Sequence, residues 1–405
     1  MPASVSANVK QYMVVTGNYW AFTLTDGALR MLVVLHFNSL GYSPLQIAML
    51  FLFYEIFGVI TNLTGGWLGA RIGLNRTMNA GLLLQIVALS MLLVPVALLT
   101  VPWVMAAQAL SGIAKDLNKM SAKSAIKMLV PADAQFSLYK WVALLTGSKN
   151  ALKGVGFFLG GALLAAVGFA GSVLVMAGGL LLVFLSSLIL LKKDLGRASL
   201  KPTFRDIFSK SPAINYLSAA RLFLFSARDI WFVVALPVYL SQTLAWDHWQ
   251  TGGFLAAWVI AYGIVQAVAP RLTGINGTLP DGHSALFWAI LLAAVPALIA
   301  LGLGSTFDPA VVLISGLMVF GVVFAINSAM HSYLIVSYAR DDGVSLDVGF
   351  YYMANAMGRL LGTLLSGWVF QSAGLAACLG ISCAMIVLAA LISIKLPFRA
   401  QGLSS

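Results

Sequence analysis

The chain has 405 residues, of which 60% are hydrophobic and only 9% are charged. Soluble domains carry roughly a quarter charged residues, so this composition excludes a soluble enzyme. At about twenty residues per span, the length allows about a dozen membrane crossings. The net charge of +11 would suggest nucleic acid as a partner of a soluble chain. In this chain the bases lie at the ends and inside the apolar runs, so we expect no nucleic-acid partner.

Turn and charge signals divide the sequence into twelve apolar segments. They lie near residues 13–37, 45–69, 77–100, 102–129, 138–167, 169–191, 214–242, 248–270, 284–304, 309–338, 347–373 and 375–396. The first segment is long and lacks a small-residue cleavage site, so we interpret it as a retained helix. The two cysteines, Cys378 and Cys383, share the last segment, which offers no disulfide framework.

Lysine and arginine fall in alternate connections only, among them those at Lys10, Arg71, Arg271, Arg340 and Lys395. The positive-inside rule then places both termini in the cytoplasm, which requires an even number of spans. The longest connection carries six bases, Lys192, Lys193, Arg197, Lys201, Arg205 and Lys210. We predict an N-terminal bundle over 1–191, a basic cytoplasmic linker over 192–213 and a C-terminal bundle over 214–405.

The two halves of the sequence share residues at fixed offsets. Asn18-Tyr19 opens the first segment as Asn215-Tyr216 opens the seventh, and Pro95 takes the place of Pro296. A shift of 209 positions aligns Gly112 with Gly321, Asn118 with Asn327 and Asp133 with Asp342. A shift of 206 aligns Lys153 with Arg359, Gly156 with Gly362, Gly161 with Gly367 and Gly168 with Gly374. These matches favour a parallel repeat of two six-helix halves over chance recurrence of glycine.

A glycine-rich motif lies between the second and third segments. The run from Gly66 to Gly73, GWLGARIG, resembles the G-x-x-x-D-R-x-G signature of the major facilitator superfamily, with Ala70 where the signature has Asp. The resemblance implies an all-α membrane protein of two pseudo-symmetric six-helix bundles and a gating loop of Gly66, Arg71, Gly73 and Arg76. The run from Gly156 to Gly161, GFFLGG, is similar to an antiporter motif of the same superfamily, although close helix packing explains its glycines equally well.

Ionisable residues inside the apolar segments number eight bases and four acids. The bases are Arg30, Lys115, Lys119, Lys149, Lys153, Arg221, Arg228 and Arg359, and the acids are Asp26, Glu55, Asp116 and Asp229. Each charge facing lipid would cost roughly 2.5–3.5 kcal/mol, so the four excess bases must face a wet cavity or partners. Such a cavity suits a multiply charged anion better than a cation.

Helical spacing arranges these residues in stripes. Asp26 and Arg30 form an expected pair along one helix, and Asp116 can neutralise Lys119, which leaves Lys115 as the freer charge. Asp229 is expected to point away from Arg228 toward a neighbouring helix. The substrate-binding candidates are Arg30, Lys115, Asn118, Lys119, Lys149, Lys153, Arg228, Asn327, His331, Tyr352, Asn355 and Arg359.

Structural roles compete with this interpretation at several positions. Lys123 and Lys127 are expected to reach the membrane surface as topology markers, with an access-path role as the alternative. Arg221 is evenly divided between surface and site, Asp26 with Arg30 between a structural ion pair and a proton carrier, and His331 is typical of a hydrogen-bonded packing residue. Proton coupling would require a titrating carboxylate, for which Asp26, Glu55 and Asp229 are the candidates.

Three charged strings resemble those of the organoarsenical efflux permeases, the ArsJ branch of the superfamily. They are NYWAFTLTDGALRMLVVLHF (18–37), SGIAKDLNKMSAKSAIK (111–127) and WVALLTGSKNALKGVGFFLGG (141–161). The resemblance implies export of 1-arseno-3-phosphoglycerate, which glyceraldehyde-3-phosphate dehydrogenase forms when arsenate replaces phosphate. It also implies a monomer in a bacterial inner membrane, without cofactor or metal. An excess of four bases agrees with a substrate that carries both an arsenate and a phosphate group.

Other functions compete with export of this anion. A transporter of ordinary organic phosphates, exchanging them for phosphate, would need the same cavity. A membrane-embedded enzyme lacks support because the spans contain no H-E-x-x-H zinc motif, paired catalytic carboxylates or G-x-S motif with a histidine. A receptor or scaffold would not require eight buried bases. The sequence therefore favours an anion exporter, with proton antiport as its hypothetical driving force.

Overall fold

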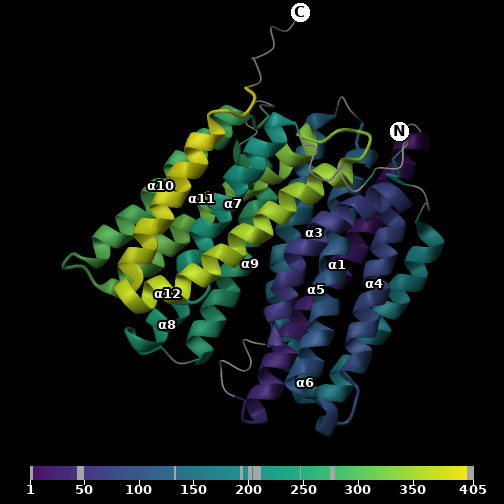
Figure 1. Cartoon of the computed structure of the whole chain (residues 1–405), viewed down its shortest axis with the longest axis horizontal. Coiled ribbons are helices and arrows are strands. Elements are labelled where there is room, and N and C mark those ends of the chain that lie inside the picture. The colour runs from purple at the N-terminus through teal and green to yellow at the C-terminus, as the bar shows by residue number, and fades with distance from the viewer. Residues whose placement is uncertain are drawn as a thin grey trace, which may run out of the picture. The chain divides into compact units, whose positions relative to one another are not determined.

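The computed structural model describes residues 3–42, 50–131, 134–191, 195–198, 203, 211–246, 248–273 and 279–398. Within these ranges the regular structure is entirely helical (Figure 1). The helices are α1 (Ala3–Ser39), α3 (Leu52–Ile72), α4 (Leu74–Met91), the short 3₁₀ turn η1 (Val96–Leu98), α5 (Val101–Leu129), α6 (Gln135–Leu190), α7 (Pro212–Phe232), α8 (Ala235–Gln242), α9 (His248–Thr273), α10 (Gly282–Leu303), α11 (Pro309–Tyr338) and α12 (Val344–Ser393).

Two of these helices are each interrupted by a glycine. Gly168 inside α6 has φ 70° and ψ −177°, and Gly374 inside α12 has φ 76° and ψ −175°. Only glycine adopts this region at little cost, so each break needs the residue that the sequence supplies. The described elements thereby form the twelve predicted segments, with α7 and α8 sharing one. The pair Gly168 and Gly374, aligned by the 206-residue shift, has the same backbone conformation in both copies, which confirms that part of the repeat.

The match between Pro95 and Pro296 is wrong as a structural equivalence. Helix α4 ends at Met91, before Pro95, and η1 follows. Pro296 instead lies inside α10. A proline has no backbone N–H to donate, so a helix either stops ahead of it or accommodates a missing hydrogen bond. The third segment is therefore shorter than the predicted 77–100.

The chain separates into two compact units. Unit 1 comprises residues 1–138, 148–209 and 339–353, and unit 2 comprises 139–147, 210–338 and 354–405. Within unit 1, α5 packs against α1, α3 and α4, and within unit 2, α11 packs against α7, α9 and α10. These central helices are the pair that the 209-residue shift aligns. The predicted boundary at 192–213 stays a prediction, because its residues 192–194, 199–202 and 204–210 lie outside the described residues.

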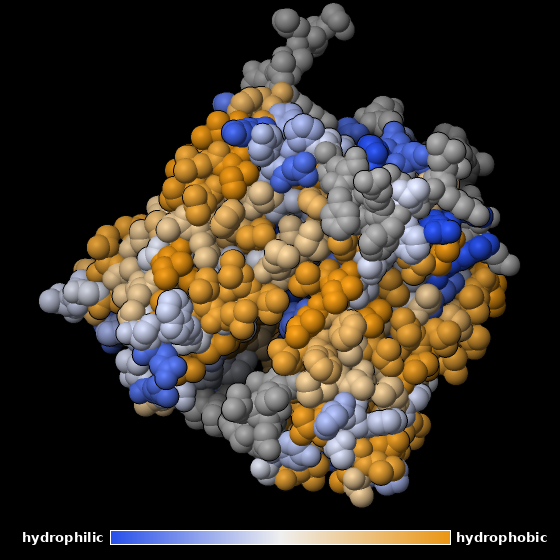
Figure 2. Space-filling model, viewed as in Figure 1, coloured by the Kyte–Doolittle hydropathy of each residue, from blue (hydrophilic) through white to orange (hydrophobic). Residues whose placement is uncertain are grey.

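Both units present hydrophobic side chains outward. Leu182 and Ile189 of α6 and Leu298 and Leu301 of α10 are among the exposed residues, and hydrophobic residues cover much of the visible surface (Figure 2). Six described helical stretches have the length and hydropathy of membrane spans. Helix α5 is not one of them, because five charged residues from Lys115 to Lys127 lower its hydropathy. A surface this apolar is typical of a multi-pass membrane protein.

Candidate functional site

Charged side chains of α1, α3 and α6 form a network in unit 1. Arg30 Nη2 lies 3.2 Å from Glu55 Oε1. The hydroxyl of Tyr54 donates to Asp26 Oδ1 at 2.7 Å, and Lys153 Nζ lies 3.7 Å from Asp26 Oδ2. The sequence predicts that Asp26 pairs with Arg30 along α1. These two ion pairs run to neighbouring helices instead, because helix packing brings Glu55 and Lys153 within reach.

Helix α5 contributes a second charged group to unit 1. Lys119 Nζ lies 2.6 Å from Asp116 Oδ1, which confirms the predicted i,i+3 pair. Lys115 Nζ lies 3.8 Å from Asp116 Oδ2 and 3.8 Å from the centre of the Tyr54 ring. The expectation that Lys115 is the freer charge is therefore wrong, since the same carboxylate serves both lysines. A cation over an aromatic face gains further electrostatic attraction.

The C-terminal part of α5 also differs from expectation. Lys123 is only 3% exposed and donates to the hydroxyl of Tyr352 at the start of α12. Lys127 donates to the carbonyl of Ala339 and lies 3.3 Å from Asp341. Lys123 does not reach toward the surface as predicted. Its four-residue spacing from Lys119 is the sequence signal that places it on the same stripe.

Two further candidates of unit 1 occupy different surroundings. Asn118 is fully buried and donates to the carbonyl of Ala114 at 3.0 Å. Its Nδ2 occupies the space that a Cβ on Gly81 of α4 would need, so Asn118 faces α4 in close packing. Lys149 donates to Asn150 Oδ1 at 3.1 Å on α6. A substrate-binding role for both residues stays a prediction.

In unit 2, one carboxylate holds two arginines of different helices. Arg228 Nη2 lies 2.5 Å from Asp229 Oδ1, and Arg359 Nε of α12 lies 3.3 Å from Asp229 Oδ2. Asp229 does reach the neighbouring helix as expected, but it also pairs with Arg228, contrary to the prediction that it points away from that arginine. Asp229 is fully buried, so its charge is compensated within the protein.

A third arginine lies near this pair. Arg221 is 3% exposed, and its Nε donates to Asn355 Oδ1 at 2.8 Å. Its guanidinium also lies 3.9 Å from the centre of the Phe225 ring, and that of Arg228 lies 4.8 Å from the same ring. The surface alternative for Arg221 is therefore wrong. One aromatic ring and one amide fix the direction of these two guanidinium groups.

The candidates on α11 are packing residues by their surroundings. Asn327 is fully buried and donates to the carbonyl of Trp288 at 2.8 Å. His331 is 1% exposed, and its Nδ1 has no hydrogen-bond partner among the described residues. The expected hydrogen-bonded histidine is therefore not found at that nitrogen. Their part in substrate binding stays a prediction.

The glycine-rich motif lies mostly inside α3 and not in a connection. Gly73, with φ 100°, is the single residue between α3 and α4. The hydroxyl of Ser345, at the start of α12 within unit 1, donates to the carbonyl of Gly66 at 2.7 Å. Ala70 is fully buried, and Arg71 is exposed with its guanidinium 5.1 Å from the Trp67 ring. Arg76 is exposed on the first turns of α4, so the gating role of the motif stays a prediction.

Each unit repeats one arrangement that the sequence offsets reveal only in part. A base on the helix that contains the glycine break pairs with an aspartate on the first helix of its unit, Lys153 with Asp26 and Arg359 with Asp229. Three residues later, Gly156 packs where a Cβ would lie 2.6 Å from the carbonyl of Leu24. Gly362 packs at the same 2.6 Å from the carbonyl of Ser226. The close approach of the backbones brings each base to its acid.

Exposure separates the bases from most of the acids. The side chains of Arg359, Arg30 and Lys153 are 35%, 28% and 21% exposed. Those of Asp26, Asp116 and Asp229 are 7%, 1% and 0% exposed, while Glu55 is the exception at 33%. Buried carboxylates thus lie behind accessible ammonium and guanidinium groups. Such a surface attracts anions.

Comparison with known proteins identifies the family. A sequence profile described as Major Facilitator Superfamily matches residues 15–346. The chain belongs to this superfamily. No curated protein matches the sequence. As a member of this superfamily, the chain is a multi-pass membrane transporter.

Solved superfamily structures share its fold. The human organic anion transporter MFSD10 (TETRAN) has a TM-score of 0.75 at 18% identity, covering 97% of this chain and 100% of that one. A bacterial homologue of the iron transporter ferroportin in its outward-facing state has a TM-score of 0.71 at 15% identity, covering 94% and 98%. The E. coli fucose:proton symporter FucP has a TM-score of 0.68 at 14% identity, covering 97% and 100%. At these identities the likeness establishes the fold alone.

Proposed function

We propose that this superfamily member exports an organic oxyanion, 1-arseno-3-phosphoglycerate, and thereby gives resistance to arsenate. The observation that carries the proposal is the exposure of bases in front of buried carboxylates in each unit. Guanidinium groups bind tetrahedral oxyanions through two parallel hydrogen bonds, and lysines add point charge. An arsenate and a phosphate on one molecule provide two such groups.

The identity of the anion rests on the resemblance of the charged strings to the organoarsenical permeases. Asp26, Arg30, Lys115, Asp116, Lys119 and Lys153 belong to those strings, and all take part in the ion pairs of unit 1. The functional partner is glyceraldehyde-3-phosphate dehydrogenase, which would supply the substrate. Transport would proceed by alternating access of the two halves in a bacterial inner membrane.

Uptake into everted membrane vesicles tests the substrate. We expect uptake of 1-arseno-3-phosphoglycerate, with weak competition from 3-phosphoglycerate and glycerol phosphate. Lys153→Ala and Arg359→Ala should each abolish it. Lys140→Gln is the matched control, because Lys140 is an exposed base on the same helix as Lys153. Equal uptake of plain phosphate esters would instead favour an organic phosphate exchanger, and unchanged uptake in both alanine variants would contradict the site.

Proton antiport is the proposed energy source. Among Asp26, Glu55 and Asp229, Glu55 has by far the most exposed carboxylate, and its partner Arg30 is a proposed substrate ligand. A proton at Glu55 would change the charge presented to Arg30 and so link protonation to substrate binding. Equal efflux with and without an imposed pH gradient would exclude this coupling.

A further inference from the structure

Four lysines follow one face of α5 at intervals of four residues. They are Lys115, Lys119, Lys123 and Lys127, and together we name them the lysine stripe. A four-residue step advances slightly more than one turn, so neighbouring lysines lie one above the other about 6 Å apart along the axis. The proposed substrate site uses only the first two. Lys123 and Lys127 continue the positive charge toward the end of α5 at Leu129.

Exposure along the lysine stripe is interrupted at one point. The side chains of Lys115, Lys119 and Lys127 are 18%, 14% and 14% exposed, whereas Lys123 is 3% exposed. The residue that covers Lys123 is Tyr352, which is itself 4% exposed. The stripe is thus accessible at both ends and closed in its middle.

Tyr352 holds two members of the stripe at once. The centre of its ring lies 4.9 Å from Lys119 Nζ and 4.6 Å from Lys123 Nζ, and its hydroxyl accepts a hydrogen bond from Lys123. Lys119 is also bound to Asp116, so the tyrosine lies at the limit of the proposed site. An incoming oxyanion would offer both lysines stronger partners than an aromatic face and a neutral hydroxyl.

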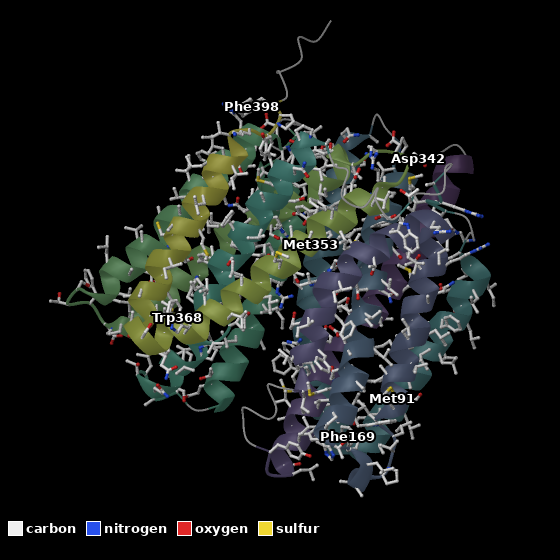
Figure 3. The ribbon with its side chains drawn as sticks, in the orientation of Figure 1. Met91, Phe169, Asp342, Met353, Trp368 and Phe398 are labelled. Atoms are coloured by element: carbon white, nitrogen blue, oxygen red, sulfur yellow. The ribbon has the colours of Figure 1, made fainter. Side chains whose placement is uncertain are left out.

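The segment that carries Tyr352 is held to unit 1 by contacts that can separate cleanly. The hydroxyl of Ser345 donates to the carbonyl of Gly66, and a Cβ on Gly349 would lie 2.7 Å from the carbonyl of Asn62. These are backbone contacts of glycines, without interlocking side chains. Asp342, just before α12, lies at the end of unit 1 opposite Met91 and Phe169 (Figure 3), so Tyr352 is two to three helical turns inward from that end.

We infer that the lysine stripe is the access route of the anion to the proposed site, and that Tyr352 is the gate that closes it between Lys119 and Lys123. The inference rests on the proposed function for its direction. Lys127 and Asp341 form the outer limit of the route, and the anion passes from each lysine to the next one turn deeper. Tyr352 is accordingly a gating residue and not a ligand of the bound substrate.

Thiol labelling of the full-length protein tests the gate without the substrate. A reporter variant carries Lys115→Cys together with Cys378→Ser and Cys383→Ser, and an anionic methanethiosulfonate reagent is added to each face of membrane vesicles in turn. From the face at which Lys127 lies, Tyr352→Ala should raise the labelling rate at least tenfold. Tyr352→Phe, which keeps the ring but loses the hydroxyl, should raise it about threefold. Phe350→Ala, a partly exposed aromatic two residues away, should leave it unchanged.

The charge of the route is tested in the Tyr352→Ala background. There, Lys127→Gln should slow the anionic reagent about threefold and leave a neutral reagent unaffected. An unchanged labelling rate in Tyr352→Ala, or an equal rise in Phe350→Ala, would overturn the gate. Either result leaves the uptake assay for the arsenylated substrate untouched. Conversely, a labelling pattern as expected with transport of another anion would retain the gate and replace the substrate.

Discussion

The two units solve the same electrostatic problem with different residues. The charged group of unit 1 combines Arg30 and several lysines with three acids, whereas unit 2 combines Arg221, Arg228 and Arg359 with Asp229 alone among the described residues. Lysine is a flexible point charge, and arginine is a planar fork that stays charged. We conclude that unit 1 can rearrange its ion pairs as an anion passes, while unit 2 offers fixed guanidinium groups.

The largest expected effect is the loss of the aspartate that serves two arginines. Asp229→Asn leaves Arg228 and Arg359 without their shared counter-charge in a buried position, so we expect a loss of stability of about 3–5 kcal/mol. Thermal unfolding in detergent measures this loss. The matched variant Asp26→Asn should lose clearly less, because Lys153 is 3.7 Å away and Tyr54 can still donate to the amide oxygen. Equal losses in both variants would remove the proposed difference between the units.

Next in size is the effect of filling the two repeated glycine contacts. In Gly156→Ala and Gly362→Ala the added methyl would lie 2.6 Å from a backbone carbonyl, so we expect each to destabilise the protein by about 1–3 kcal/mol. Gly367→Ala is the control on α12, because nothing described lies within 4 Å of its Cβ. A similar melting temperature for all three variants would show that the close approach is not needed.

Exchanging the two kinds of base should affect transport in one unit more than in the other. Arg359→Lys removes a fork that binds oxyanions through two hydrogen bonds, so we expect kcat/KM for uptake to fall roughly tenfold or more. Lys153→Arg should stay within about threefold, since either base can pair with Asp26. Vesicle uptake at several substrate concentrations distinguishes these outcomes. The reverse order of effects would assign the rigid site to unit 1.

The smallest expected change concerns Glu55. Glu55→Gln should leave uptake without a pH gradient within about threefold of the wild type, and should abolish its response to an imposed gradient. The reason is that glutamine can still accept a hydrogen bond from Arg30 but cannot titrate. Efflux measured at equal and unequal pH provides the comparison. A retained response to the gradient would move the coupling to another group.

The class of protein, the twelve segments and much of the repeat follow from the amino-acid sequence alone. Hydrophobic composition and periodicity depend on single helices, and the break at Gly168 and Gly374 depends on one residue type with a special backbone conformation. The Asp116–Lys119 pair is also predictable, because both residues lie on one helix. The charged strings further indicate an anion as the substrate.

Which charges meet depends on how the helices pack in three dimensions. The Arg30–Glu55, Asp26–Lys153 and Asp229–Arg359 pairs join residues of different helices, and helical spacing says nothing about which neighbour a helix faces. The burial of Lys123 under Tyr352 has the same origin, since the two residues are separated by 229 positions in the chain. A stripe of charges can be found from periodicity, but its partners and its closed point depend on packing between helices.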